Sequence, residues 1–159
     1  MSNSLKITTP SDREIAMTRV FDAPRKLVFE AYTRPELLKS WLGVFGGWAL
    51  DVCEIDLRVG GAYRYEWKKA GGKSMGVSGV FLEVTPDERL VTNEAFDDPW
   101  YKGEGHSTVT FVETGGKTTM TMTLRYDSKD VRDAVLASPM EHGVAASYDK
   151  LEELLLAKV

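Results

Sequence analysis

The 159-residue chain has one cysteine, two histidines and no long hydrophobic run, and each of these scarcities excludes a class of protein. A single thiol, Cys53, cannot form an internal disulfide or build a thiolate metal site, which fits a reducing compartment. The sequence has no run of about 18 apolar residues and no signal-peptide pattern at its start, so it predicts neither a membrane span nor secretion. We therefore expect a cytoplasmic protein without a disulfide framework.

The sequence also has no excess of positive charge. The 24 acidic and 20 basic side chains give a net charge of −4. Because neutralising phosphates requires a basic surface, we expect no nucleic acid and no membrane as a partner. The content of 43% hydrophobic and 28% charged residues is typical of a globular protein. The length predicts one domain over residues 11–159, preceded by a flexible N-terminus over residues 1–10.

Hydrophobic periodicity divides the chain into a strand-rich centre and helical segments. Alternation over residues 13–21 predicts a first strand. Asp22 and Pro24 then favour the start of a short helix, and the capping pair Thr33 and Glu36 favours a second one. Alternating runs separated by glycine or proline turns predict six further strands. Their approximate bounds are 49–57, 62–68, 75–84, 90–95, 107–113 and 118–125.

The C-terminal part returns to helical spacing. A short helix is predicted over residues 128–137, and Ser138 followed by Pro139 favours the start of a second helix. An apolar stripe that includes Tyr148 and Leu155 makes this a helix of about five turns. The order of elements predicts an α+β fold in which a seven-stranded antiparallel sheet wraps around the long terminal helix. We expect a space to remain between sheet and helix.

Three segments carry a resemblance to a known family. Residues 35–41, residues 56–61 and the ending 143–155 are similar to the homologues of the activator of the heat-shock-protein-ninety ATPase, C-terminal-domain type, and the likeness covers residues 13–155. This resemblance implies the SRPBCC superfamily, with START lipid-transfer domains, the major birch pollen allergen and polyketide cyclases, and hence the helix-grip fold. Such proteins include ligand carriers, enzymes and proteins of unknown role, so the function has to be argued from the site.

Aromatic side chains are the most prominent candidate feature. Tyr63, Tyr65 and Trp67 fall on one face of a predicted strand because strand side chains alternate. With other large apolar residues they could line a small-molecule pocket, or they could simply fill the core. The candidate ligand-binding residues are Trp41, Trp48, Tyr63, Tyr65, Trp67, Phe81, His106, Met120, Met122, Met140, Val144 and Tyr148.

Motifs for metal binding or catalysis are missing. His106 and His142 have no HExxH motif, paired cysteines or clustered carboxylates beside them, so we expect no metal and no cofactor. His106 could be a polar anchor or a general base if it faces the pocket. A buried Glu54 or Glu94 would be more informative, because an interior carboxylate must change its pKa or find a partner.

Three functions remain open. The preferred one is non-catalytic binding of a small apolar, aromatic or lipid-like molecule between the sheet and the terminal helix. The second is a cyclase- or hydratase-like enzyme that uses His106, Tyr65, Tyr101 or Glu94 for proton transfer in the same pocket. The third is a stress-response module that binds a heat-shock chaperone through an apolar patch around Trp100 and Tyr101. The sequence is compatible with a monomer or a homodimer.

Overall fold

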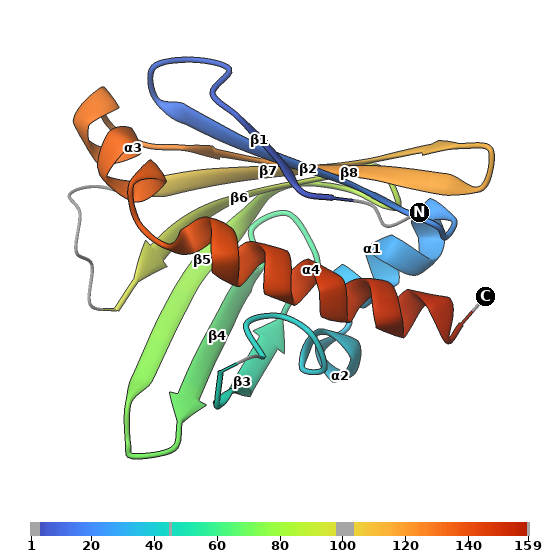
Figure 1. The fold of residues 1–159 in the computed structure, drawn as a ribbon, viewed down its shortest axis with the longest axis horizontal. Coiled ribbons are helices and arrows are strands. Elements are labelled where there is room, and N and C mark those ends of the chain that lie inside the picture. Colours follow the sequence, from blue (N-terminus) through green and yellow to red (C-terminus); the bar gives the residue numbers. More distant parts are fainter. Residues whose placement is uncertain (1–3, 45, 98–103, 159) are drawn as a thin grey trace.

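The computed structural model describes residues 4–44, 46–97 and 104–158, in which helices cover one face of an eight-stranded antiparallel sheet (Figure 1). The strands lie in the order β1-β2-β8-β7-β6-β5-β4-β3. Their bounds are β1 Lys6–Thr8, β2 Glu14–Phe21, β3 Trp48–Ile55, β4 Ala62–Lys69, β5 Ser74–Thr85, β6 Arg89–Phe96, β7 Gly105–Thr114 and β8 Lys117–Arg125. The helices are α1 Arg25–Thr33, α2 Pro35–Leu38, α3 Lys129–Leu136 and α4 Met140–Leu156.

The sheet confirms the predicted α+β class, with one difference in strand number. Strands β3 to β8 form a meander, and β2 completes it by pairing with β8. The structure has eight strands and not the predicted seven, because Lys6–Thr8 pairs with Ala16–Thr18. A strand of three residues is too short to show a period of two, so alternation could not reveal it. The sheet and the long terminal helix are consistent with a helix-grip fold.

The helices lie where the spacing predicts them, but the caps predicted from Asp22, Thr33 and Ser138 are wrong, because α1, α2 and α4 have no side-chain cap. The Thr33 hydroxyl donates to the Phe29 carbonyl of α1 (2.7 Å) and does not cap α2. The Ser138 hydroxyl likewise donates to the Val135 carbonyl of α3 (2.5 Å) and does not cap α4. Both hydroxyls therefore satisfy carbonyls at the end of the preceding helix. No helix in the described part of the chain is long and apolar enough to cross a membrane.

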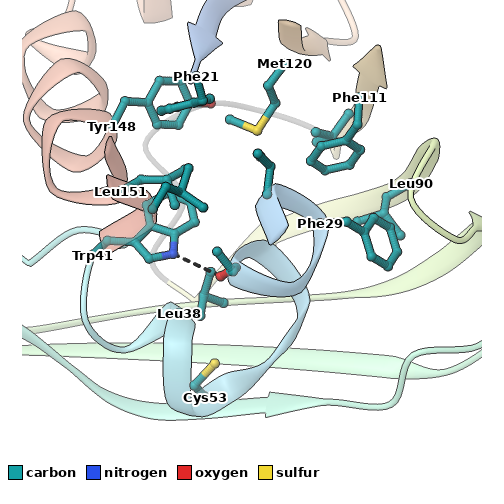
Figure 2. Close-up of a cluster of buried hydrophobic side chains, with 14 of the residues drawn as sticks. Phe21, Phe29, Leu38, Trp41, Cys53, Leu90, Phe111, Met120, Tyr148 and Leu151 are labelled. Atoms are coloured by element: carbon teal, nitrogen blue, oxygen red, sulfur yellow. Dashed lines mark hydrogen bonds between the residues drawn. The ribbon is translucent and has the colours of Figure 1, made fainter. Parts of the chain in front are cut away.

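Helix α4 runs diagonally across the sheet, and large side chains fill the layer beneath its middle (Figures 1 and 2). Tyr148 of α4 packs edge-on against Phe21 of β2, with ring centroids 5.9 Å apart. Trp41, three residues after the end of α2, also packs against Tyr148, with ring centroids 6.2 Å apart. Trp41 and Met120 of β8 are both fully buried. This part of the interior is a solid core.

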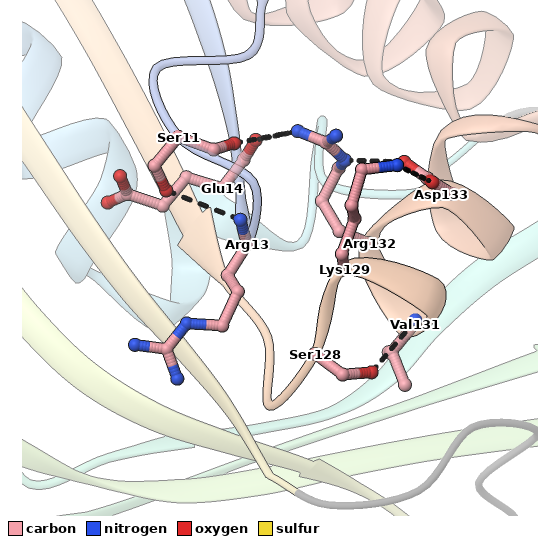
Figure 3. Close-up of polar contacts among 8 residues, drawn as sticks. All are labelled: Ser11, Arg13, Glu14, Ser128, Lys129, Val131, Arg132 and Asp133. Carbon is pink, nitrogen blue, oxygen red and sulfur yellow. Dashed lines mark hydrogen bonds and ion pairs between the residues drawn. The ribbon is translucent and has the colours of Figure 1, made fainter.

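Two arginines fix the C-terminal helices to the sheet. Arg19 of β2 is only 2% exposed and forms ion pairs with Asp149 (2.7 Å) and Glu152 (3.0 Å) of α4. Arg132 of α3 donates to the carbonyl of Ser11 (2.7 Å), in the turn between β1 and β2 (Figure 3). These contacts position α4 over β2 and hold α3 against the β1–β2 turn.

Candidate functional site

A cavity of about 150 Å³ lies between α1, the segment after α2 and strands β4 to β8. An apolar cavity of about 150 Å³ in another protein is large enough for benzene, so one aromatic ring fits a space of this size. Among the described residues, none from α4 lines the cavity. The lining residues are Tyr32, Thr33, Leu42, Tyr63, Tyr65, Trp67, Val77, Phe81, Leu90, Thr92, Glu94, Phe96, Ser107, Val109 and Met122.

Strand β6 supplies the polar side of the cavity. Its alternate residues face inward, which places Glu94 on the same face as Leu90 and Phe96. In the register of the sheet, Glu94 lies opposite Gly105 of β7. Because Gly105 has no side chain, nothing from that position fills the space beside the carboxylate.

Strand β4 supplies an aromatic wall. The Tyr63 and Tyr65 ring centroids are 5.1 Å apart, and those of Tyr65 and Trp67 are 5.9 Å apart. Phe81 of β5 extends the wall at 5.8 Å from Tyr63. Rings at these separations form favourable tilted or edge-to-face pairs, so the wall is held in shape by its own contacts.

Hydrogen bonds to the backbone fix the two ends of this wall. The Tyr63 hydroxyl donates to the Asn93 carbonyl (2.9 Å). The Trp67 indole N–H donates to the Leu42 carbonyl (2.9 Å), which ties β4 to the segment after α2. Between them, burial raises the pKa of Tyr65 well above its ordinary value, so its hydroxyl stays protonated.

Glu94 is the one carboxylate among the described residues that line the cavity. The side chain is partly buried, and no hydrogen bond or ion pair joins it to the described part of the chain. Burial raises the pKa of Glu94 to about 7. Burial, and after it the Glu94 charge, raises the pKa of Tyr32. The pKa of Tyr65 is raised mainly by burial, and Glu94 adds less to it than Tyr32, Cys53 or Tyr63. A carboxylate with neutral hydroxyls nearby can bind a polar group or move a proton.

The Tyr32 hydroxyl has only a weak acceptor within the described structure. It donates to the sulfur of Met122 at 3.7 Å. A thioether sulfur is a weak acceptor, and the hydroxyl oxygen keeps its own acceptor capacity. Tyr32 can therefore take part in binding a polar group that enters the cavity.

Five of the twelve predicted ligand-binding residues line the cavity, and three others are in the solid core. Trp41 and Met120 are fully buried beneath α4 together with Tyr148 of α4 itself, and the three occupy the space in which the sequence predicted a pocket. The cavity lies to one side of this core, towards strands β4 to β6. The five lining residues are Tyr63, Tyr65, Trp67, Phe81 and Met122.

The other four predicted residues lie away from the cavity. Met140 and Val144 of α4 pack against a second, smaller core cluster near α3. Trp48 lies at the start of β3, with the Lys69 ammonium 5.9 Å from its ring centroid. His106 is exposed 3.9 Å from Glu104, because it alternates with the inward-facing residues of β7.

Several lining residues were not among the twelve predicted ligand-binding residues, although Glu94 was named as a candidate for proton transfer. The alternation of Leu90, Thr92, Glu94 and Phe96 along β6 is the signal that could have found that side of the cavity. Nothing in the sequence could assign Tyr32, because its place depends on how α1 packs across the sheet.

Two larger depressions lie on the open surface. One of about 470 Å³ is lined by Arg125 and residues 11–14, and one of about 710 Å³ lies over the outer side of β3 to β5. Their walls carry exposed charged side chains and lie open to solvent, unlike the mostly apolar walls of the cavity. Within residues 4–44, 46–97 and 104–158, no three His, Cys, Asp or Glu side chains are grouped to hold a metal ion.

The predicted chaperone-binding patch around Trp100 and Tyr101 lies outside the described residues. Residues 98–103, which make up most of the loop that contains them, are all outside the described part of the chain. Chaperone binding through this patch therefore stays a prediction.

The fold and the site define an α+β protein of helix-grip type with a small interior cavity walled by aromatic rings. The chain belongs to the family described as Activator of Hsp90 ATPase homolog 1-like protein, whose model matches residues 22–156. The family membership that the sequence predicted is thereby confirmed.

Solved structures of bacterial proteins match nearly the whole chain. A protein from Rhodobacter sphaeroides is 29% identical, with a TM-score of 0.92 over 97% of this chain and 99% of that chain. One from Nitrosomonas europaea is 25% identical, with a TM-score of 0.82 over 94% and 98%. One from Mycobacterium smegmatis, at 21% identity and a TM-score of 0.85 over 99% and 100%, shows the shared fold alone. No curated protein matches the chain.

Proposed function

We propose that the protein binds a small apolar or aromatic molecule, about one ring in size, in the cavity between α1 and strands β4 to β8. The observation that supports this is the cavity itself, a hollow of about 150 Å³ inside an otherwise filled core. Mostly apolar and aromatic walls with a few polar groups are typical of small-molecule sites. A long acyl chain exceeds this volume, so we favour a compact ligand over a lipid.

Toluene is a suitable first probe, because it fills one ring and carries no charge. In a titration followed by amide chemical shifts, we expect changes concentrated in β4, β5 and β6, with a Kd of about 1 mM or tighter. Ser107 lines the cavity and is buried, so Ser107→Leu should fill the space and abolish binding. Val112→Leu is the matched control, because Val112 is exposed on the other face of the same strand.

The outcome is informative when both variants give the dispersed spectrum of a folded protein. Toluene shifts that vanish in Ser107→Leu and persist in Val112→Leu support the cavity as the site. Shifts that persist in both variants, or no shifts with the unmodified protein, refute the proposal.

A second candidate, an enzyme that transfers protons, is favoured by one observation, the position of Glu94. A carboxyl whose pKa is near 7 can act as a general acid or base at neutral pH. Acetophenone in deuterium oxide tests this: the Glu94 carboxylate would remove a methyl proton, a tyrosine hydroxyl would donate to the carbonyl oxygen, and the enolate would take up deuterium. Exchange above the buffer rate that is lost in Glu94→Gln supports the enzyme, and binding without exchange supports a carrier.

A further inference from the structure

We infer that the cavity selects a small aromatic amine, with the ring against the β4 aromatic wall and the ammonium group at the Glu94 carboxylate. This inference rests on the proposed function, since it names the chemical class of the ligand for the same cavity. Three observations support the inference: the charge of the cavity lining, the lack of a partner for Glu94 among the described residues, and the aromatic faces beside Glu94.

The charge of the lining disfavours anionic ligands. Glu94 is acidic, and the described lining residues contain no lysine, arginine or histidine. A ligand carboxylate or phosphate would therefore meet a like charge in a poorly solvated space, without a cation to offset it. This disfavours fatty acids for a reason that is independent of their size.

The surroundings of Glu94 favour a cation over a neutral ligand. An ionised carboxylate that is removed from water without a partner is unfavourable. Glu94 faces Gly105 across the strand pair and has no ion-pair partner among the described residues. A neutral aromatic ligand would leave the Glu94 carboxylate without a partner. An ammonium group would supply the missing partner and a charge-assisted hydrogen bond.

The aromatic wall suits the rest of such a ligand. Tyr65 lies between Tyr63 and Trp67, at 5.1 Å and 5.9 Å between ring centroids. Aromatic faces attract an organic cation and also pack against another ring. The Tyr32 hydroxyl, bonded only to the weak Met122 acceptor, has an oxygen that can accept a second ammonium hydrogen. One ring with a short aminomethyl arm matches both the volume and these groups.

Three probes with the same ring separate charge from size: benzylamine, toluene and benzoate, titrated at pH 8 against the unmodified protein. We expect benzylamine to bind more tightly than toluene, and benzoate to bind most weakly. In Glu94→Gln, the affinity for benzylamine should fall roughly 10- to 100-fold, because a hydrogen bond between charged groups is lost. The affinity for toluene should stay within about threefold, since its contacts with the wall are unchanged.

Glu54→Gln is the matched control, because it removes an exposed carboxylate on β3 outside the cavity lining. It should leave the benzylamine affinity unchanged, which separates a local effect from a change in net charge. If Glu94→Gln fails to fold, Glu94→Asp keeps the charge but withdraws it from the ligand, and an intermediate loss is expected. Toluene binding with no preference for benzylamine overturns this inference and leaves the proposed function standing. Binding of none of the three probes refutes both.

Discussion

Glu94 should make the protein less stable as the pH rises from about 4.5 to about 7. The pKa of its carboxyl is raised from 4.5 to about 7 by burial in the folded protein. Over this interval the folded state holds a proton that the unfolded state has released. The free energy of unfolding therefore falls as the pH rises, because stability decreases with pH wherever the native state binds more protons. The contribution is fully present below pH 4.5 and is lost above about pH 7.

The expected size of the effect follows from the two pKa values. The interval from 4.5 to about 7, at about 1.4 kcal/mol for each pKa unit, corresponds to about 3 kcal/mol. A neutral glutamine at this position has no such dependence on pH. The stability of the unmodified protein relative to Glu94→Gln should thus decline by about 3 kcal/mol across the interval.

Urea unfolding of both proteins at half-unit steps from about pH 4 to 8 measures this difference directly. Other titrating groups are common to the two proteins, so their contributions cancel in the comparison. Glu54→Gln serves as the control, and its stability relative to the unmodified protein should stay within about 0.5 kcal/mol throughout. A difference between the unmodified protein and Glu94→Gln that is constant from pH 4 to 8 would refute the reasoning, because burial would then impose no penalty on the charged form.

Two further predictions concern the walls of the cavity and the buried thiol. Gly43 has a φ of +70° and a Cβ there would overlap the Trp67 indole nitrogen, so Gly43→Ala should cost about 2 to 4 kcal/mol in denaturant unfolding. Gly46→Ala, at a φ of +61° with open space around it, should cost only about 1 kcal/mol, and equal losses would contradict the clash. Burial raises the pKa of Cys53 to about 11. Iodoacetamide at pH 8, followed by intact mass, should therefore modify it roughly 100-fold more slowly in the native protein than in urea, and equal rates would show an accessible thiolate.

Alternation along the central strands made most of the fold predictable. The period of two placed Tyr63, Tyr65 and Trp67 on one face, and the structure confirms that all three face inward. Glycine turns between the alternating segments predicted the meander, because a short loop makes the two strands that it joins pair with each other. The hydroxyl caps were harder to predict: Thr33 and Ser138 can each accept from the next helix or donate to the previous one, and the choice depends on backbone geometry that residue type does not determine.

The position of the cavity could not be predicted, because it depends on which side chains meet in three dimensions. Trp41 and Tyr148 come from segments about a hundred residues apart, and together they fill the space beneath α4. Both are large aromatic residues, and composition alone does not distinguish a residue that fills a core from one that lines a pocket. The hollow is left where small or short inward residues, such as Ser107, face the aromatic wall.

The chemistry of the cavity depends on strand register more than on the presence of any one residue. The alternation of side chains along β6 could have placed Glu94 on the inward face. Whether its carboxylate has a partner depends, however, on which residue of β7 lies opposite Glu94. In the observed register this residue is Gly105, and the adjacent His106 points outward. Because a shift of one residue moves every side chain to the other face, such a shift in β7 would bring the His106 imidazole towards the carboxylate and supply an internal hydrogen-bond partner. The empty position beside Glu94, on which the proposed selection of an amine depends, is therefore a consequence of the pairing between β6 and β7.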